Sequence, residues 1–355
     1  MRPDTRAVYL RAQSVLNVAG EDAAALHGET PEPRPLPFDP ARLAHALATP
    51  RLPADRFDRK IQRSVEPQGL RLLYCVARLA RPLQALDLPP ERVALCAAIP
   101  EVDAPSPCWD AVEAMGRQPD KPVAGLLANT PPLHALTLLN SSVMAYVAEA
   151  LRCNGPMAGY CSQANAGLDA LIEATRQIAE DNADAALVIS SSPNLTPALY
   201  LREEAEHRSP VVHGEGAAAL LLTAEPPEQG PRVRIAGYAR GYGAGDERAA
   251  EVARRVLNQV LHAERLNPSD VQRIVADRRD PLLADLLRGL PVLDDSRRAT
   301  GELGASGLLT DLAYVLSEPS AAARGGPHYA LVLSHTQAGH FGAVLLAIDV
   351  REKSA

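Results

Sequence analysis

The sequence predicts an α/β protein in which helices cover mixed β-sheets in layers, and three observations lead to this prediction. Apolar stretches of strand length alternate with longer stretches of helical periodicity. The order of these stretches begins again in the last third of the chain. With 46% apolar residues among 355, the chain can also bury a large core. We therefore expect two related halves, residues 1–228 and 229–355, built around buried mixed sheets.

The first part of the chain predicts a strand, an irregular segment, a helix and a second strand. An apolar run within residues 6–20 predicts the opening strand. The following GETPEPRPLPFDP has five prolines in thirteen residues and predicts an irregular surface segment, because proline lacks a backbone donor and fixes φ. Apolar residues at helical spacing predict a helix over 68–86, and LDLPPERVALCAAI predicts a turn and a buried strand after it.

The middle of the chain alternates most regularly. HALTLLNSSVMAYVAEALRCNGP predicts a helix ended by Asn-Gly-Pro, and MAGYC predicts a short strand after it. LDALIEATRQIAEDNA predicts a second helix and AALVISSS the next strand. The glycine turn and apolar run of HGEGAAALLLTAE then close the first half.

The second half repeats this alternation. PRVRIAGYARGYGAG predicts a strand and a turn, residues 247–265 a helix, and SDVQRIVADRRDP a strand that leads into a loop. TGELGASGLLTDLAYVLSE predicts a glycine-rich turn that opens a helix. ALVLSHTQAGHFGAVLLAID predicts two strands joined by a glycine turn.

Composition excludes several classes of function. There are 36 basic and 43 acidic residues, and no dense Lys/Arg block, so we expect no nucleic-acid partner. No stretch approaches the roughly 20 apolar residues of a membrane span, and we expect a cytoplasmic protein. The five cysteines lack CxxC spacing and predict buried thiols, and the histidines lack the spacing of a metal site.

Six motifs in this order resemble those of β-ketoacyl-ACP synthases, the ketosynthases of the thiolase fold. The resemblance covers nearly the whole chain and implies five layers, αβαβα, with mixed five-stranded sheets. The six motifs are LQALDLPPERVALCAAI, HALTLLNSSVMAYVAEALRCNGPM, GLDALIEATRQIAEDNADAALVISSS, VVHGEGAAALLL, TGELGASGLL and SHTQAGHFGA.

The residues that perform the condensation in that family are replaced in this chain. In the family, a cysteine at a strand-to-helix turn takes up the acyl chain, and two histidines assist decarboxylation. By resemblance the cysteine position is occupied by Ala164, the first histidine position by Asp277 or its neighbour Arg278, the second by Glu302, and a family lysine position by Arg297. A methyl group cannot attack a thioester, and a carboxylate would repel a developing oxyanion. Condensing activity is therefore not expected.

Loss of all three residues on a retained scaffold resembles the chain length factors, which pair with an active ketosynthase. Such a subunit would bind no cofactor, because its partner takes substrates from the phosphopantetheine arm of an acyl carrier protein. The resemblance also implies an aryl polyene, an aromatic polyketide or a modified fatty acid as product. Its implied site residues are a vestigial pocket of Gln163, Ala164, His335 and His340, a tunnel wall of His134, Leu138, Leu139 and Met144, and a dimer seam from Met157 to Cys161.

Three alternatives stay open from the sequence. Cys161 could be a displaced nucleophile of an active condensing or acyl-transfer enzyme, assisted by His335 or His340, although a buried structural cysteine is the simpler interpretation. Asp277 and Glu302 could form an acid–base pair. The chain could also be a non-enzymatic acyl-binding homodimer.

Overall fold

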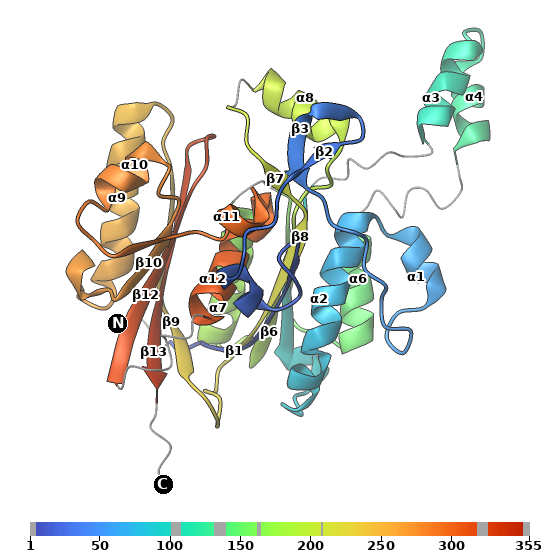
Figure 1. Cartoon of the computed structure of the whole chain (residues 1–355). Helices are drawn as coiled ribbons and strands as arrows, with labels where there is room; N and C mark the ends of the chain where they lie inside the picture. Colours follow the sequence, from blue (N-terminus) through green and yellow to red (C-terminus); the bar gives the residue numbers. More distant parts are fainter. Residues whose placement is uncertain are drawn as a thin grey trace.

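The structure is a computed structural model that describes residues 5–100, 108–130, 140–161, 165–206, 209–317 and 326–350. Its strands form a ten-stranded sheet in the order β11-β10-β12-β13-β9-β1-β8-β6-β4-β5 and a three-stranded sheet in the order β2-β3-β7 (Figure 1). The large sheet consists of two five-stranded halves, because β1 and β9 pair at only two positions, Tyr9 with Arg234 and Leu10 with Val233.

The first half of the large sheet is mixed. Strand β4 runs parallel to β5 and β6, whereas β8 runs antiparallel to β6 and β1. Strand β5 is the outer edge of this half. The five strands are β1 (Tyr9–Asn17), β4 (Val93–Ala98), β5 (Met157–Tyr160), β6 (Ala185–Ser191) and β8 (Gly216–Thr223).

The second half is also mixed and follows in the chain. Strand β10 runs parallel to β11 and β12, whereas β13 runs antiparallel to β12 and β9. The five strands are β9 (Arg232–Tyr242), β10 (Arg273–Ala276), β11 (Val292–Asp294), β12 (Gly326–His335) and β13 (His340–Val350). The division at residue 228, which falls between β8 and β9, stays a prediction.

Helices cover the outer face of each half and fill the space between the two halves (Figure 1). The expected αβαβα layering is thereby confirmed. The outer helices of the first half are α2 (Pro67–Gln84) and α6 (Asn140–Leu151), the central helices are α7 (Ala166–Ala179) and α12 (Gly307–Ser317), and the outer helices of the second half are α9 (Asp246–His262) and α10 (Pro281–Leu286).

The central helices are buried because both sheets pack against them. The side chains of Leu168, Leu171 and Ile178 in α7 are fully buried in one cluster with strands of both halves. A Cβ built on Gly167, in the first turn of α7, would lie 2.3 Å from the carbonyl oxygen of Ala305. Only glycine allows α7 to approach this turn so closely.

The proline-rich segment corrects one expectation. It is not wholly irregular: strand β2 (Arg34–Leu36) lies inside it, and β3 (Asp39–His45) begins there. Both belong to the three-stranded sheet with β7 (His213–Gly214), in which β2 is an edge strand. Pro35 is accommodated because the edge of a sheet does not require every backbone donor.

No helix in the described part of the chain is long and apolar enough to cross a membrane.

Shorter elements connect these layers. Helix α11 holds residues of the site described below, and α3 and α4 lie in residues 108–130, for which no element was predicted. These elements are α1 (Arg59–Ser64), α3 (Cys108–Arg117), α4 (Pro122–Asn129), α8 (Pro197–Ala205), α11 (Arg297–Thr300) and the 3₁₀ turns η1 (Ala23–His27), η2 (Pro90–Arg92), η3 (Pro268–Asp270) and η4 (Gly304–Ser306).

Candidate functional site

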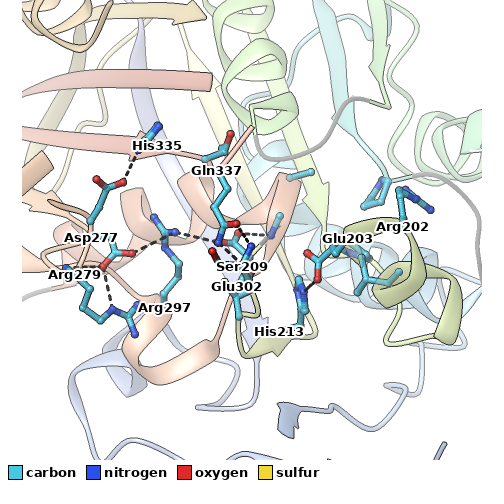
Figure 2. A pocket seen from close by; sticks show the side chains of 18 of the residues that line it. Arg202, Glu203, Ser209, His213, Asp277, Arg279, Arg297, Glu302, His335 and Gln337 are labelled. Carbon is cyan, nitrogen blue, oxygen red and sulfur yellow. Dashed lines mark hydrogen bonds and ion pairs between the residues drawn. The ribbon is translucent and has the colours of Figure 1, made fainter. Parts of the chain in front are cut away.

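A cavity of about 460 Å³ lies where the two halves of the molecule meet (Figure 2). The first half contributes Cys161, Leu199 and Glu203 to its wall. The second half contributes, among others, Asp277, Arg297, Glu302 and His335. The volume is in the range of small-molecule sites in proteins, and the wall carries both apolar and charged groups. We therefore take this cavity as the candidate functional site.

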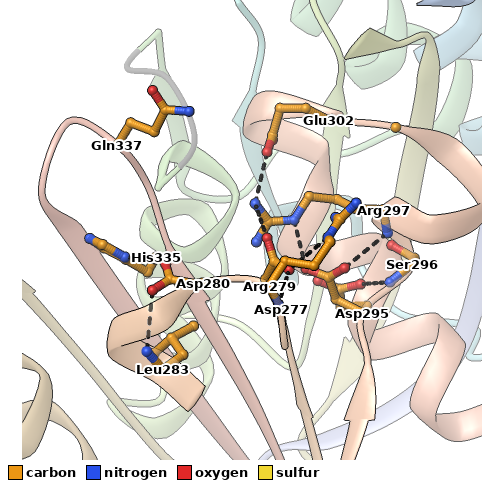
Figure 3. A network of polar contacts seen from close by, with 12 residues as sticks. Asp277, Arg279, Asp280, Leu283, Asp295, Ser296, Arg297, Glu302, His335 and Gln337 are labelled. Atoms are coloured by element: carbon orange, nitrogen blue, oxygen red, sulfur yellow. Dashed lines mark hydrogen bonds and ion pairs between the residues drawn. The ribbon is translucent and has the colours of Figure 1, made fainter. Parts of the chain in front are cut away.

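Asp277 and Glu302, which the sequence resemblance placed at the two histidine positions, are joined by one arginine. Asp277 follows strand β10, and Arg297 lies in α11. Nη1 of Arg297 lies 3.0 Å from Oε2 of Glu302 and 3.6 Å from Oδ2 of Asp277 (Figure 3). Sequence reasoning named these three positions separately, and the fold brings them into one ion network.

The other oxygens of the two carboxylates also have partners. Glu302 Oε1 accepts a hydrogen bond from the backbone N–H of Gly304 at 2.9 Å. Asp277 Oδ1 accepts from the backbone N–H and the Nε–H of Arg279, at 3.0 and 3.1 Å. Because these contacts occupy the oxygens of both carboxylates, the two residues are poorly placed to exchange protons with a substrate.

Two further carboxylates complete the surroundings of Arg297. Asp295 Oδ2 accepts from Arg297 Nε at 2.6 Å, and Asp311 Oδ1 in α12 accepts from the backbone N–H of Ser296 at 2.8 Å. Burial opposes the charge of Arg297, but the nearby carboxylates outweigh it, and the pKa of Arg297 is raised. Sequence reasoning missed both aspartates, although the run DDSRR places Asp295 beside basic residues.

Burial also acts on these aspartates. Asp311 is fully enclosed in the protein, and burial, together with the neighbouring charge of Asp295, raises its pKa to about 7. Burial raises the pKa of Asp295 as well, against the attraction of Arg297. The network therefore holds more acidic groups than one guanidinium can neutralise.

A histidine–carboxylate pair forms another part of the wall. His335 Nδ1 lies 2.5 Å from Oδ2 of Asp280, and Asp280 Oδ1 accepts from the backbone N–H groups of Leu282 and Leu283 at the start of α10 (Figure 3). Burial opposes the charged form of Asp280, but His335 and the backbone donors outweigh it and lower the pKa of Asp280. Asp280 was not among the residues predicted for the site.

The opposite wall contains a second histidine with a carboxylate. His213 Nε2 lies 2.8 Å from Oε2 of Glu203 in α8, and its ring contacts Tyr200 edge to face. His213 is buried. Next to it, Glu215 forms a buried ion pair with Arg71 of α2 at 3.0 Å.

Cys161 differs from its predicted surroundings. A buried structural cysteine was expected, but Cys161 is exposed and lines the cavity. The reason is its position one residue beyond the edge strand β5, whose side chains are at most half-buried because only β4 pairs with it. The other cysteines whose side chains are described, Cys75, Cys96 and Cys153, are buried, and burial raises the pKa of each thiol to about 12.

The remaining predicted residues are distributed around the cavity. His340 is exposed, with its ring 5.0 Å from that of Tyr242, and is not among the described residues that line this cavity. Met144 of α6 packs beneath strand β5, where its Sδ would lie 3.0 Å from a Cβ on Gly159. Met157 is 52% exposed on β5.

Several predicted residues lie outside the described residues. They are the tunnel candidates His134, Leu138 and Leu139 and the pocket candidates Gln163 and Ala164.

Among the residues that the structure describes, no group of three or more histidine, cysteine or acidic side chains could hold a metal ion.

Comparison with solved structures places the fold. The chain is similar to the ishigamide ketosynthase/chain length factor, with a TM-score of 0.76 and 16% identity over 97% of this chain and 99% of that chain. It is also similar to a β-ketoacyl synthase from Burkholderia phymatum, with a TM-score of 0.71 and 14% identity over 98% of this chain and 100% of that chain.

A third similar structure is the type II PKS ketosynthase AntDE in complex with its acyl-carrier protein AntF. It has a TM-score of 0.71 and 13% identity over 98% of this chain and 100% of that chain. No family model matches the chain, and no curated protein matches its sequence. These similarities show that the chain has the ketosynthase, or thiolase-like, fold over nearly its whole length.

Proposed function

We propose that this chain is a ketosynthase-like subunit without condensing activity, a chain length factor that pairs with an active ketosynthase. The observation that carries the proposal is the network around Arg297. Where the family has two imidazoles, this chain has two carboxylates held by one guanidinium at 3.0 and 3.6 Å. Such a network can stabilise the wall of the cavity, but it supplies neither of the two imidazoles.

The scaffold supports the pairing role. Strand β5 forms an open edge of the ten-stranded sheet, and Met157 presents an exposed apolar side chain there. In this proposal the edge meets the same strand of the partner, so that the two subunits share one cavity system. The partner would be an active ketosynthase with an acyl carrier protein, and Met144, beneath the edge, would help to bound the tunnel.

A condensing assay tests the proposal. The isolated chain should release no CO₂ from malonyl-ACP and form no β-ketoacyl product, whereas the chain co-purified with a Cys-His-His ketosynthase should elongate acyl chains. Removal of the partner's nucleophilic cysteine should abolish this activity. Elongation by the isolated chain, or by the pair that lacks the partner's cysteine, would contradict the proposal.

One observation supports a second candidate, an acyl transferase that uses Cys161. The thiol is exposed and lines the cavity, contrary to the prediction from sequence. An acyl group found on Cys161 after incubation with acyl-ACP, located by mass spectrometry of peptides, would favour this candidate. Absence of the modification under conditions that load the partner would exclude it.

A further inference from the structure

The histidine–carboxylate pair of His335 and Asp280 has the geometry of a general base with its orienting residue. An ionised carboxylate only accepts hydrogen bonds, so the 2.5 Å contact makes Nδ1 of His335 the donor. The lone pair of the neutral ring then lies on Nε2. Asp280 itself is held by the two backbone N–H groups of α10, so the carboxylate cannot turn away from the histidine.

The ring of His335 is fixed in its plane as well. It stacks on Phe341 of β13 with centroids 4.1 Å apart and an angle of 4° between the planes. The structure records a hydrogen bond at Nδ1 and none at Nε2 among the described residues, and Nε2 is not among the buried polar atoms that lack a partner. His335 lines the cavity, and with Nδ1 engaged, Nε2 is the ring nitrogen left for a molecule bound there.

Among the described residues of the wall, the other carboxylates and the other histidine are already engaged. Asp277 and Glu302 are held by Arg297, and the second lining histidine, His213, uses Nε2 on Glu203. The cavity is large enough for an acyl group together with water molecules. His335 is thus the lining residue best placed to take a proton from water.

We infer that His335 and Asp280 give this chain a hydrolytic activity of its own toward acyl thioesters bound in the cavity. A water molecule attacks the thioester carbonyl carbon while His335 Nε2 accepts the water's proton. The C–S bond then breaks, and the same Nε2 returns the proton to the leaving sulfur. The products are a carboxylic acid and a thiol, and no group is oxidised or reduced.

A cation lies in the same wall for the charge that develops on the carbonyl oxygen. Arg279, next to Asp280 in the chain, contacts Asp277 through its Nε, and its side chain is 70% exposed (Figure 2). Its terminal nitrogens can reach an anionic oxygen in the cavity. The choice of thioesters as the substrate class rests on the function proposed above. The assignment of His335 as the base and of Asp280 as its orienting residue does not.

The test uses the isolated full-length chain and hexanoyl-N-acetylcysteamine, with the released hexanoic acid measured by chromatography. The native chain should hydrolyse this thioester in repeated turnovers, and His335→Gln should lower kcat/KM about 100-fold or more. Asp280→Asn, which can still accept the backbone N–H groups, should lower kcat/KM as well. His335→Ala should regain activity when imidazole is added, which a purely structural role of the ring would not produce.

The matched control is His340→Gln, because His340 lies on the same turn but outside the cavity and should leave the rate unchanged. Thermal unfolding of each variant shows whether it is folded. Equal rates for the native chain and a folded His335→Gln, or an acyl group on a cysteine of the quenched protein, would overturn the inference. A chain that lacks hydrolysis but supports elongation with its partner would overturn the inference alone, and hydrolysis without pairing would overturn only the proposed function.

Discussion

Arg297 is the residue on which the polar half of the cavity depends. Its guanidinium contacts Asp295 at 2.6 Å, Glu302 at 3.0 Å and Asp277 at 3.6 Å, and its side chain is only 19% exposed. A buried charge network of this kind need not add to the net stability of the chain. Removal of one of its side chains is nevertheless costly, because the remaining charges stay buried without a partner. Asp277, Asp295, Glu302 and Arg297 are therefore coupled to one another.

We expect Arg297→Met to destabilise the chain by about 3 kcal/mol, because three carboxylates would lose their cation in a mostly buried place. Urea unfolding at pH 7.5 measures the change. The control is Arg278→Met, whose side chain is 61% exposed and whose ion pair with Asp294 is 3.9 Å long, and which should cost less than about 0.5 kcal/mol. Equal losses for the two variants would contradict the role given to the network.

Because the pKa of Asp311 is raised in the folded chain, we expect the free energy of unfolding to depend on pH. Its pKa in the folded chain, about 7, is above the ordinary value of 3.8, so the folded chain keeps the proton while the unfolded chain loses it. The stability that this group contributes is present below about pH 4 and is lost as the pH rises to about 7. Asp311→Asn can still accept the N–H of Ser296 and cannot ionise.

The measurement compares the unfolding free energy of the native chain and Asp311→Asn at pH 5 and pH 8. His45, whose pKa is lowered by burial, acts in the opposite direction in this range, so the difference between the two proteins is the useful quantity. The unfolding free energy of Asp311→Asn minus that of the native chain should increase by roughly 2 kcal/mol from pH 5 to pH 8. A difference independent of pH would show that Asp311 does not titrate in this range.

At the scale of elements, hydrophobic periodicity predicted those helices and strands that pack against the apolar faces of other elements. Strands β4 and β6 were expected from continuous apolar runs, since both faces of each are covered by helices. The small sheet was not predicted, because Pro35 and Pro37 hide the strand pattern of β2, and because β7, which pairs with β3, comes from a distant segment. Local sequence cannot show that two short segments meet.

The candidate site was predictable in its residue types but not in its contacts. Asp277, Glu302 and Arg297 were found by position relative to motifs, whereas their common network depends on how α11 meets the end of β10. Asp280 was missed because it pairs with His335, 55 residues further along the chain. The exposure of Cys161 follows from its place beside a sheet edge, which composition does not reveal.

The close approach of α7 to η4 gives a prediction for a single element. Gly167→Ala would place a Cβ 2.3 Å from the carbonyl oxygen of Ala305, so the central helix must shift, and we expect a loss of about 2 kcal/mol or more in thermal or urea unfolding. Gly116→Ala in α3 is the control, because its Cβ would meet nothing within 4 Å, and it should leave stability unchanged or slightly raised. Equal stabilities of the two variants would show that the central layer can adapt.

At the scale of the whole molecule, five layers leave one half of the sheet with an open edge beside the cavity. Strand β5 has four residues, pairs with β4 on one side, and is followed directly by Cys161 of the cavity wall. Among the described residues no strand pairs with its other side, and an edge with an exposed Met157 is a place where another chain can add its own strand. In the proposed function, the edge therefore connects assembly of the pair with the shape of the cavity.

Met157→Asp tests this connection, because a carboxylate at the edge would be buried without a partner when the strands of two subunits meet. We expect the variant to fold normally alone, since the side chain is 52% exposed there, but to lose co-purification with the active ketosynthase and with it the elongation of acyl chains. Tyr242→Asp, on the 58% exposed end of β9, is the control that should keep the pair intact. Size-exclusion chromatography of co-expressed chains gives the result, and a stable pair formed by Met157→Asp would show that the two subunits meet through another surface.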